Sequence, residues 1–328
     1  MYDFEGQLGN NKLVPQILDK STNETIKEIL EGLRRTPKHL DICHFYSSSD
    51  FTSSSSTKAA FLNNRILRRS KLIKSNKETI QNIFSDKEKI RLVEVGNDSS
   101  SQKTKSIIEI LWESNIQFEF IPISNSKRYL EYYITELWQQ FPSINVFPLA
   151  GNYLDILADL ASESTPILVV LSDLVTKEGR EEKKQRIEQV SSTLNYGDWV
   201  QIDFELKADP RILSKSTPDN APKKALISTL NEMLQGNFDE ASFIYYPHYN
   251  PQTGEQQTCL VSTKRQNVYL AIADETISFK MWECISIESV QRYAPKEIES
   301  LAHSTGFIPR ITLFDYSRQT CCSFWQKE

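Results

Sequence analysis

Short apolar runs alternate with longer amphipathic segments between residues 90 and 204. Short apolar runs are typical of buried strands, and apolar residues that recur every three or four positions are typical of helices. Strands that alternate with helices pair in parallel, because parallel neighbours need a crossover connection. The pattern therefore predicts a doubly wound α/β domain. The expected strands are 90–95, 118–123, 144–149, 167–171 and 199–204, and the expected helices are 103–113, 127–140, 154–160 and 178–194.

The residues before this region have a helical pattern. Ser21-Thr22-Asn23-Glu24 has the form of a capping box, and apolar residues follow it at helical spacing as far as Leu33. We expect a first helix that begins at this box and ends before Pro37, followed by helices over 61–73 and 77–84.

After residue 206 the alternation stops. A helix over 224–234 is followed by strand-like runs with no helix between them, which favours an antiparallel sheet in a second domain. Pro295 and Gly306 frame a late helix. We expect the last two strands to return to the first sheet as an antiparallel edge. The strand-like runs are 243–249, 258–262, 268–273 and 277–281, and the last strands are 311–314 and 321–325.

Composition limits the classes of protein. The 328 residues are 39% hydrophobic and 25% charged, enough for one large or two medium globular domains. The chain has no apolar run long enough to span a membrane and no signal-peptide pattern, so we expect a cytoplasmic protein without a membrane partner. The net charge is -5, and basic residues are interleaved with acidic ones, so nucleic acid is not an expected partner.

The cysteines and histidines do not have metal-site spacing. The five cysteines form no CxxC pair, and the four histidines form no HxxxH or HExxH pattern, so we expect reduced thiols and no metal. Cys321 and Cys322 follow each other on an expected strand and should point to opposite faces of the sheet.

Residues 90–104 read as a strand, a tight turn and a helix start, which is where α/β proteins hold nucleotide-like cofactors. Gly96 directly follows the apolar strand, which indicates a backbone that needs positive φ or close approach to a ligand. Glu94 either contacts a cofactor or caps the following helix, and Lys103 either pairs with a cofactor carboxylate or is solvated. Glu205 ends another strand at the edge where α/β sites lie.

Several blocks along the chain carry a resemblance to a known family. They are Pro37-Lys38-His39-Leu40 leading to Phe45-Tyr46, Glu94-Val95-Gly96 with Lys103-Thr104, Gly197-Asp198 with Asp209-Pro210, Leu230-Asn231 with Phe238-Asp239, Phe243 with Tyr249-Asn250, and Glu288 with Arg292-Tyr293. In this order they resemble the histidine N-alpha-methyltransferases of ergothioneine biosynthesis, a family that includes fungal tryptophan-derivative N-methyltransferases. The resemblance spans nearly the whole chain.

The resemblance implies two domains. One is a Rossmann-like methyltransferase domain that binds the cofactor S-adenosylmethionine (SAM), and the other is an α+β domain that binds the substrate. The first domain is expected over 72–206 and 295–328, and the second over 1–71 and 207–294, with the substrate held between them. The implied cofactor-binding residues are Glu94, Gly96, Lys103, Ser124, Asn152 and Tyr153. Tyr46 and Glu288 are implied to act on the substrate, and Glu205 joins them as a catalytic candidate from its position in the strand.

The sequence also departs from the family pattern. Asp98 stands where the cofactor loop has a second glycine, and Ser124 stands where an acidic residue meets the ribose. Asn152 replaces the acid of an Asp-aromatic pair that contacts adenine, and 171–176 replaces a glycine-rich run. In the substrate region, Val290 replaces a serine, no counterpart of a substrate-binding asparagine is found near Lys223, and a serine tract over 47–56 replaces a tyrosine-bearing segment.

Two hypotheses about function follow. The first is a SAM-dependent N-methyltransferase that acts on an amino acid or small amine. The alternative is a methyltransferase-like protein that has lost SAM binding and serves as a module for a protein partner or a small ligand. A melting scan with and without SAM distinguishes them, because a bound ligand stabilises the folded state.

Overall fold

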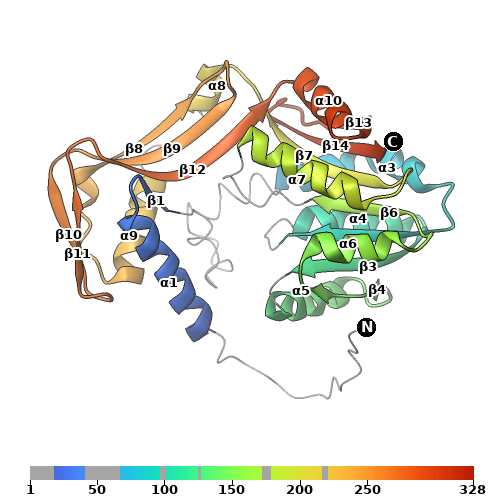
Figure 1. Ribbon diagram of the computed structural model, residues 1–328, viewed down its shortest axis with the longest axis horizontal. Helices are drawn as coiled ribbons and strands as arrows, with labels where there is room; N and C mark the ends of the chain where they lie inside the picture. The colour runs from blue at the N-terminus through green and yellow to red at the C-terminus, as the bar shows by residue number, and fades with distance from the viewer. Residues whose placement is uncertain (1–17, 41–66, 97–100, 125–126, 172–178, 216–220) are drawn as a thin grey trace.

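The computed structural model describes residues 18–40, 67–96, 101–124, 127–171, 179–215 and 221–328. Within these ranges, a twelve-stranded sheet runs through the molecule and a two-stranded sheet lies beside it. Figure 1 shows the helices and strands grouped into a parallel part on the right and an antiparallel part on the left. The sequence positions Tyr46 and Asp98, the serine tract and residues 172–176 lie outside the described residues.

The parallel part has the strand order β3-β2-β6-β7. These strands pair in parallel, and helices connect them, which confirms the predicted α/β class. β14 pairs with β7 antiparallel and β13 pairs with β14, as expected of the last two strands. The strands are β2 (Lys89–Val95), β3 (Gln117–Ser124), β4 (Asn145–Val146), β5 (Leu149–Ala150), β6 (Ile167–Leu171), β7 (Trp199–Leu206), β13 (Phe307–Phe314) and β14 (Thr320–Lys327), and the helices are α3 (Lys77–Phe84), α4 (Ser101–Glu113), α5 (Lys127–Gln140), α6 (Tyr153–Ala161), α7 (Arg180–Thr193) and α10 (Pro295–Ser304).

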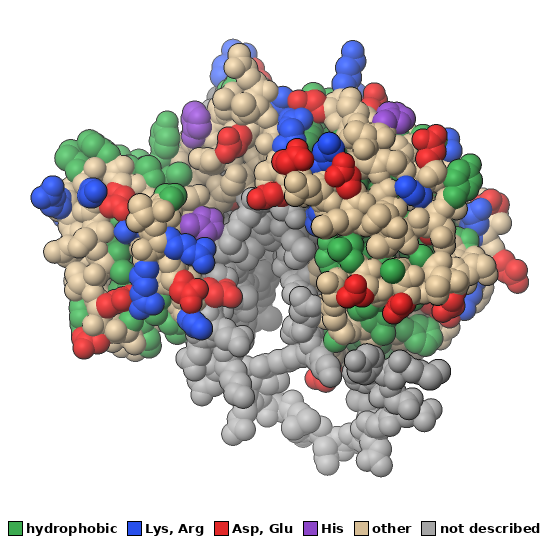
Figure 2. All heavy atoms as spheres, in the orientation of Figure 1, with side chains coloured by type: hydrophobic (Ala, Val, Ile, Leu, Met, Phe, Trp, Pro, Cys, Tyr) green, Lys and Arg blue, Asp and Glu red, His purple; other side chains and the backbone are tan. Residues whose placement is uncertain are grey.

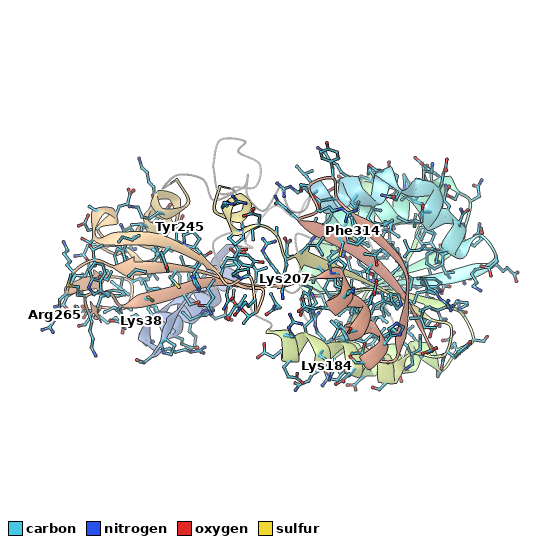
Figure 3. All side chains as sticks on the ribbon, turned by 90° about the horizontal axis from the view of Figure 1, so that it is seen from above. Lys38, Lys184, Lys207, Tyr245, Arg265 and Phe314 are labelled. Atoms are coloured by element: carbon cyan, nitrogen blue, oxygen red, sulfur yellow. The ribbon has the colours of Figure 1, made fainter. Side chains whose placement is uncertain are left out.

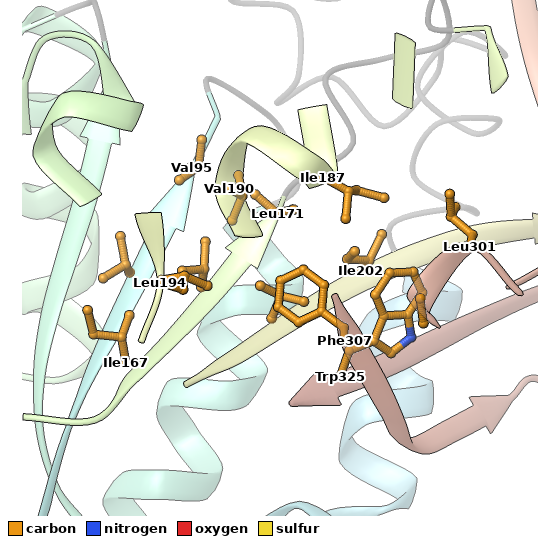
Figure 4. Close-up of a cluster of buried hydrophobic side chains, with 14 of the residues drawn as sticks. Val95, Ile167, Leu171, Ile187, Val190, Leu194, Ile202, Leu301, Phe307 and Trp325 are labelled. Carbon is orange, nitrogen blue, oxygen red and sulfur yellow. The ribbon is translucent and has the colours of Figure 1, made fainter. Parts of the chain in front are cut away.

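Both faces of the parallel part are buried under helices. One hydrophobic layer includes residues of α6, α7 and α10, among them Ile187 and Leu301, which Figure 4 shows packed near Trp325. The other layer includes residues of α3, α4 and α5. Cys321 belongs to the first layer and Cys322 to the second, so the prediction that they face opposite sides is confirmed.

The antiparallel part has its own hydrophobic cluster. Apolar residues of α1 and α9 pack there against the inner face of the sheet formed by β8, β9 and β12. β10 and β11 form the separate hairpin. The elements are α1 (Leu18–Arg34), β1 (Lys38–His39), α8 (Pro210–Lys215), α9 (Ala221–Leu234), η3 (Glu240–Ser242), β8 (Phe243–Tyr249), β9 (Glu255–Ser262), β10 (Gln266–Leu270), β11 (Glu275–Phe279) and β12 (Cys284–Tyr293).

β12 joins the two parts through β7. β6 pairs with β7 as far as Ile202, and beyond that point β12 pairs with β7 in parallel, Arg292 opposite Glu205 and Tyr293 opposite Leu206. Lys207 follows at the same junction, where Figure 3 shows it between the two parts, and its ammonium lies 3.1 Å from Glu297. One strand therefore belongs to both halves of the sheet.

Three expectations about elements were wrong. The first helix begins at Leu18, so the capping-box pattern at residues 21–24 lies inside it. The strand expected over 144–149 is divided into β4 and β5, because Pro148 has no N–H for the ladder. β12 was not expected, although it is the longest strand in the described residues.

The surface adds two observations. Figure 2 shows acidic and basic side chains interspersed over the visible face. Among the described helices, none combines the length and apolar character needed to cross a bilayer.

Candidate functional site

The carboxyl ends of adjacent parallel strands bring several of the expected cofactor residues to one edge of the sheet. Val95 pairs with Ile123, and Ser124 pairs with Ala150, so β2, β3 and β5 end side by side. Gly96 follows β2 with φ 139°, and Gly151 follows β5 with φ 152°. Backbone of this kind favours glycine, and two such turns on the strands that flank β3 leave room for a ligand to approach the main chain.

Ser124 and Asn152 supply the polar side chains at this edge. Ser124 ends β3 and is buried. Asn152 caps α6, and its Oδ1 accepts the backbone N–H of Leu154 at 2.9 Å. A carbonyl oxygen has two lone pairs, so Oδ1 can also accept an amino group. Tyr153 is half-buried in the first turn of α6 and packs against the hydrophobic layer below.

Glu94 faces the helices, not the end of the strand. Its carboxyl group accepts the hydroxyl of Thr104 on α4 at 2.5 Å and bonds the side chain of Tyr133 on α5. The side chain is 3% exposed, and this burial raises the pKa of Glu94 because the charged form loses its hydration. β2 is therefore linked directly to α4 through Glu94 and Thr104.

Lys103 lies in a buried ion pair. Its Nζ is 2.7 Å from Oδ2 of Asp203, and both side chains are 1% exposed. Gln201 donates to the other oxygen of Asp203 at 2.8 Å, and the ammonium of Lys183 lies 3.2 Å from the backbone oxygen of Asp203. Lys103 therefore has a counter-ion, Asp203, within the protein.

Glu205 belongs to the same charged network. Its carboxylate lies 3.3 Å from Arg69 and 3.5 Å from Arg292, and Arg69 also lies 3.5 Å from Asp203. Arg292 donates to the backbone oxygen of Leu206 at 3.0 Å. The network therefore ties β7, β12 and the helical segment at residues 67–75 together where the two halves of the sheet meet.

Glu288 is separated from this network along β12. It is 6% exposed and pairs opposite Thr258 of β9, next to a shift in register. Arg292 is four positions further along β12, about 13 Å away along the strand. Tyr46, the remaining catalytic candidate, lies outside the described ranges.

Sequence reasoning did not select Asp203, Arg69, Arg292 or Lys183 as candidate site residues, although Arg292 stands in one of the blocks that resemble the family. A signal was present, because Gln201, Asp203 and Glu205 alternate along β7 and so share one face. The buried side of a strand is an unusual place for three polar residues, and it calls for buried cations as partners. In the described residues, no group of three or more His, Cys, Asp and Glu side chains could hold a metal ion.

Comparison with known proteins identifies the family. The sequence profile of histidine-specific, SAM-dependent methyltransferases matches residues 25–327. Similar solved structures include the CcbJ methyltransferase from Streptomyces caelestis, with 12% identity over 77% of this chain and 95% of that chain and a TM-score of 0.42. Magnesium protoporphyrin IX methyltransferase from Synechocystis PCC 6803, with bound SAH, is 10% identical over 80% of this chain and 84% of that chain, with a TM-score of 0.43.

No curated protein matches the chain significantly. The assignment rests on the family profile, which covers nearly the whole chain and includes both halves of the sheet. The chain therefore belongs to the family of histidine-specific, SAM-dependent methyltransferases.

Proposed function

We propose that this chain is an active N-methyltransferase that uses SAM to methylate an amino acid or a small amine. The observation that carries the proposal is the meeting of Gly96, Ser124 and Gly151-Asn152 at the carboxyl edge of adjacent parallel strands. In doubly wound sheets ligands bind at this edge, and the family supplies the identity of the cofactor.

The residues at this edge fit SAM in chemistry. The two positive-φ glycines, Gly96 and Gly151, would let the backbone approach the methionine and nucleoside parts, and the Ser124 hydroxyl would bond the ribose. Asn152 would accept the adenine amino group with the second lone pair of Oδ1, beside the ring of Tyr153. When bound, SAM supplies a methyl group on a sulfonium, which is already a good leaving group.

The chain's own contribution to methyl transfer is mainly to hold a neutral amine in line with the methyl group. Such positioning is worth up to about 7 to 11 kcal/mol of the barrier. Glu205 is already paired with Arg69 and Arg292, so an ammonium would have to compete with two guanidinium groups. Glu288 and Tyr46 are the substrate residues that the family resemblance implies, so we assign Glu288 the role of orienting the amine and accepting its proton, and Tyr46 the role of lining the methyl path.

Thermal unfolding with SAM and with SAH tests the binding step. Ligand at about 100 times its dissociation constant should stabilise the folded protein by about 2.7 kcal/mol, seen as a higher melting temperature. Gly96→Val should abolish this shift, because a β-branched side chain opposes the backbone at φ 139° and blocks approach of the ligand.

Gly197→Val is the matched control. Gly197 also has positive φ, 91°, but it lies just before β7, at the opposite edge of the sheet, so its variant should keep the SAM shift while being strained in the same way. With binding established, mass spectrometry of amines and amino acids incubated with SAM should show the gain of one methyl group. If millimolar SAM and SAH leave the melting temperature of the wild-type protein unchanged, the enzyme proposal fails.

The second candidate is a methyltransferase-like module without SAM binding. The buried Lys103–Asp203 pair favours it, because the cation expected to face a cofactor carboxylate is already engaged. Ser124 favours it too, since a hydroxyl makes a weaker bond to the ribose than a carboxylate does. This candidate predicts no SAM shift in either wild-type or Gly96→Val protein.

A further inference from the structure

The outer face of the antiparallel sheet holds two thiols on neighbouring strands. In the register of β9 and β12, Ser286 lies opposite Cys259 and Cys284 lies opposite Val261. Residues that are directly opposite share a face, and so do residues two apart on a strand. Cys259 and Cys284 are therefore diagonal neighbours on the same face of the sheet, and this face is opposite to the one covered by α1 and α9, toward which Leu260 and Ile285 point.

Solvent can reach the two thiols to different degrees. The register of the two strands places Cys259 and Cys284 diagonally across from each other on this face. Cys284 is exposed and Cys259 is half-buried. The Cys284 thiol also contacts the backbone oxygen of Trp282 at 3.8 Å. An oxidant from solution can thus reach the pair at Cys284.

The backbone next to the pair can absorb the adjustment that a bond requires. Diagonal neighbours have Cα atoms about 7 to 8 Å apart, whereas disulfides favour separations below about 7 Å. The register of β12 shifts between Ser286 and Glu288, two residues from Cys284. Because the ladder is irregular between Ser286 and Glu288, the first residues of β12 can shift relative to β9 while the pairs from Glu288 onward stay in place.

The other described cysteines are unsuited to oxidation. Cys321 and Cys322 are fully buried in the two hydrophobic layers on either side of β14. Burial raises the pKa of Cys321 to about 12 and that of Cys322 well above its usual value. Because the thiolate is the reactive form, both side chains are protected. Cys43 lies outside the described residues.

We propose that Cys259 and Cys284 are a reversible redox pair, which hydrogen peroxide converts to a disulfide that links β9 to β12. The Cys284 thiolate attacks one peroxide oxygen, the O–O bond breaks, and the second oxygen leaves as water after taking up a proton. The sulfur of Cys259 then attacks the sulfenic sulfur of Cys284, the S–O bond breaks, and the hydroxide leaves as water with the proton from Cys259.

The electrons balance, because two thiols give one electron pair to the peroxide, and the products are one disulfide and two water molecules. Cys284 is the attacking residue because it is exposed, whereas burial raises the pKa of the Cys259 thiol and the adjacent Cys284 adds to this shift. The bond closes beside the register shift that precedes Glu288, and it forms whether or not the chain methylates a substrate.

Peptide mapping of the full-length protein after peroxide treatment tests the proposal. Of the five thiols in the chain, two should disappear from a titration in denaturant, and the peptides with Cys259 and Cys284 should be joined in one chain. Dithiothreitol should restore both thiols. Unchanged thiols, a link to Cys43 or a link between two chains would each overturn the proposal.

Single-serine variants assign the steps. Cys284→Ser should prevent the link, and Cys43→Ser, the matched control, should leave it intact. In Cys259→Ser no thiol is present at position 259 to attack the sulfenic acid of Cys284. After brief peroxide treatment, dimedone, which labels sulfenic acids, should therefore modify Cys284. Failure of Cys284 to take the label in that variant would contradict its assignment as the attacking residue.

Discussion

Glu94 is a buried carboxyl group whose hydrogen bonds come from hydroxyl groups, while the charges of Lys103 and Lys105 act on it from nearby. Thr104 and Tyr133 supply its hydrogen bonds from two helices, and burial raises its pKa. Lys103, one residue from Thr104, has its ammonium on Asp203. β2 is therefore linked to α4 through a carboxyl group whose neutral form is favoured by burial.

Glu94→Gln should remove one contribution to the pH dependence of stability. Because the folded pKa of Glu94 is raised above its ordinary value of 4.5, its stabilising contribution is complete below that value and is lost as the pH rises through the folded pKa. The loss amounts to at most about 1.4 kcal/mol per pH unit. Urea unfolding at increasing pH should therefore show the wild type losing stability relative to Glu94→Gln.

Glu119→Gln is the control of opposite sign. Burial disfavours ionisation of Glu119, but Lys89 and Arg91 outweigh it and lower the pKa. The stabilising contribution of Glu119 is therefore present above its ordinary pKa and is lost as the pH falls through the lowered pKa. With rising pH, the free energy of unfolding of the wild type should therefore increase relative to that of Glu119→Gln. Equal pH profiles for the two variants would contradict the assignment of the Glu94 shift.

Residue-level prediction from the sequence succeeded in placing Gly96, Ser124 and Asn152 at strand ends, since strand ends follow from local apolar patterns. Their roles with a cofactor stay predictions. The position of Lys103 could not be derived in this way, because its partner Asp203 is 100 residues away and pairs with it only through packing of α4 on β7.

At the scale of elements, β12 is the strand that the pattern of hydrophobic residues did not predict. Its apolar residues Ile285 and Ile287 alternate with polar ones, but the register shift after Ser286 moves the alternation by one position. Glu288 and Arg292 then occupy buried positions that normally hold apolar residues. A bulge and buried charges interrupt the alternation of apolar and polar residues, which is the pattern from which strands are predicted.

Gly254→Ala should disrupt the contact of the β8–β9 turn with the end of β12. A Cβ atom on Gly254 would lie 2.1 Å from the backbone oxygen of Arg292, and φ is also positive, 79°. Gly197→Ala isolates the backbone strain, because its φ is 91° and nothing lies within 4 Å of its Cβ. We expect about 1 kcal/mol of destabilisation for Gly197→Ala and clearly more for Gly254→Ala in urea unfolding. Equal losses in the free energy of unfolding for the two variants would show that the turn can move away from β12 without cost.

At the scale of the molecule, the hydrophobic residues separate into clusters that match the two halves of the sheet. In the described ranges, two clusters cover the faces of the parallel part and a third lies within the antiparallel part. The sequence predicted the class of each half from the presence or absence of helices between strands. The merging of both halves at β7 depends on pairings between distant segments, which local patterns do not contain.

Paired core truncations test whether the halves are separate folding units. Phe279→Ala and Phe120→Ala each remove a fully buried ring, one from the antiparallel part and one from the parallel part, at a cost of about 3 to 5 kcal/mol. Hydrogen exchange should increase in β8, β9 and β12 for Phe279→Ala, and in β2 and β3 for Phe120→Ala. Equal increases in both halves for either variant would indicate one cooperative unit and contradict the expected two-domain division.

The adjacent positions of Cys321 and Cys322 have a consequence for the kinetics of unfolding. One side chain is sealed in the layer under α6, α7 and α10, and the other in the layer under α3, α4 and α5. Neither thiol can be alkylated until its own layer opens, because burial keeps both protonated. The alkylation rate of Cys321 therefore reports when the helices on one side of β14 detach, and the alkylation rate of Cys322 reports when those on the other side detach.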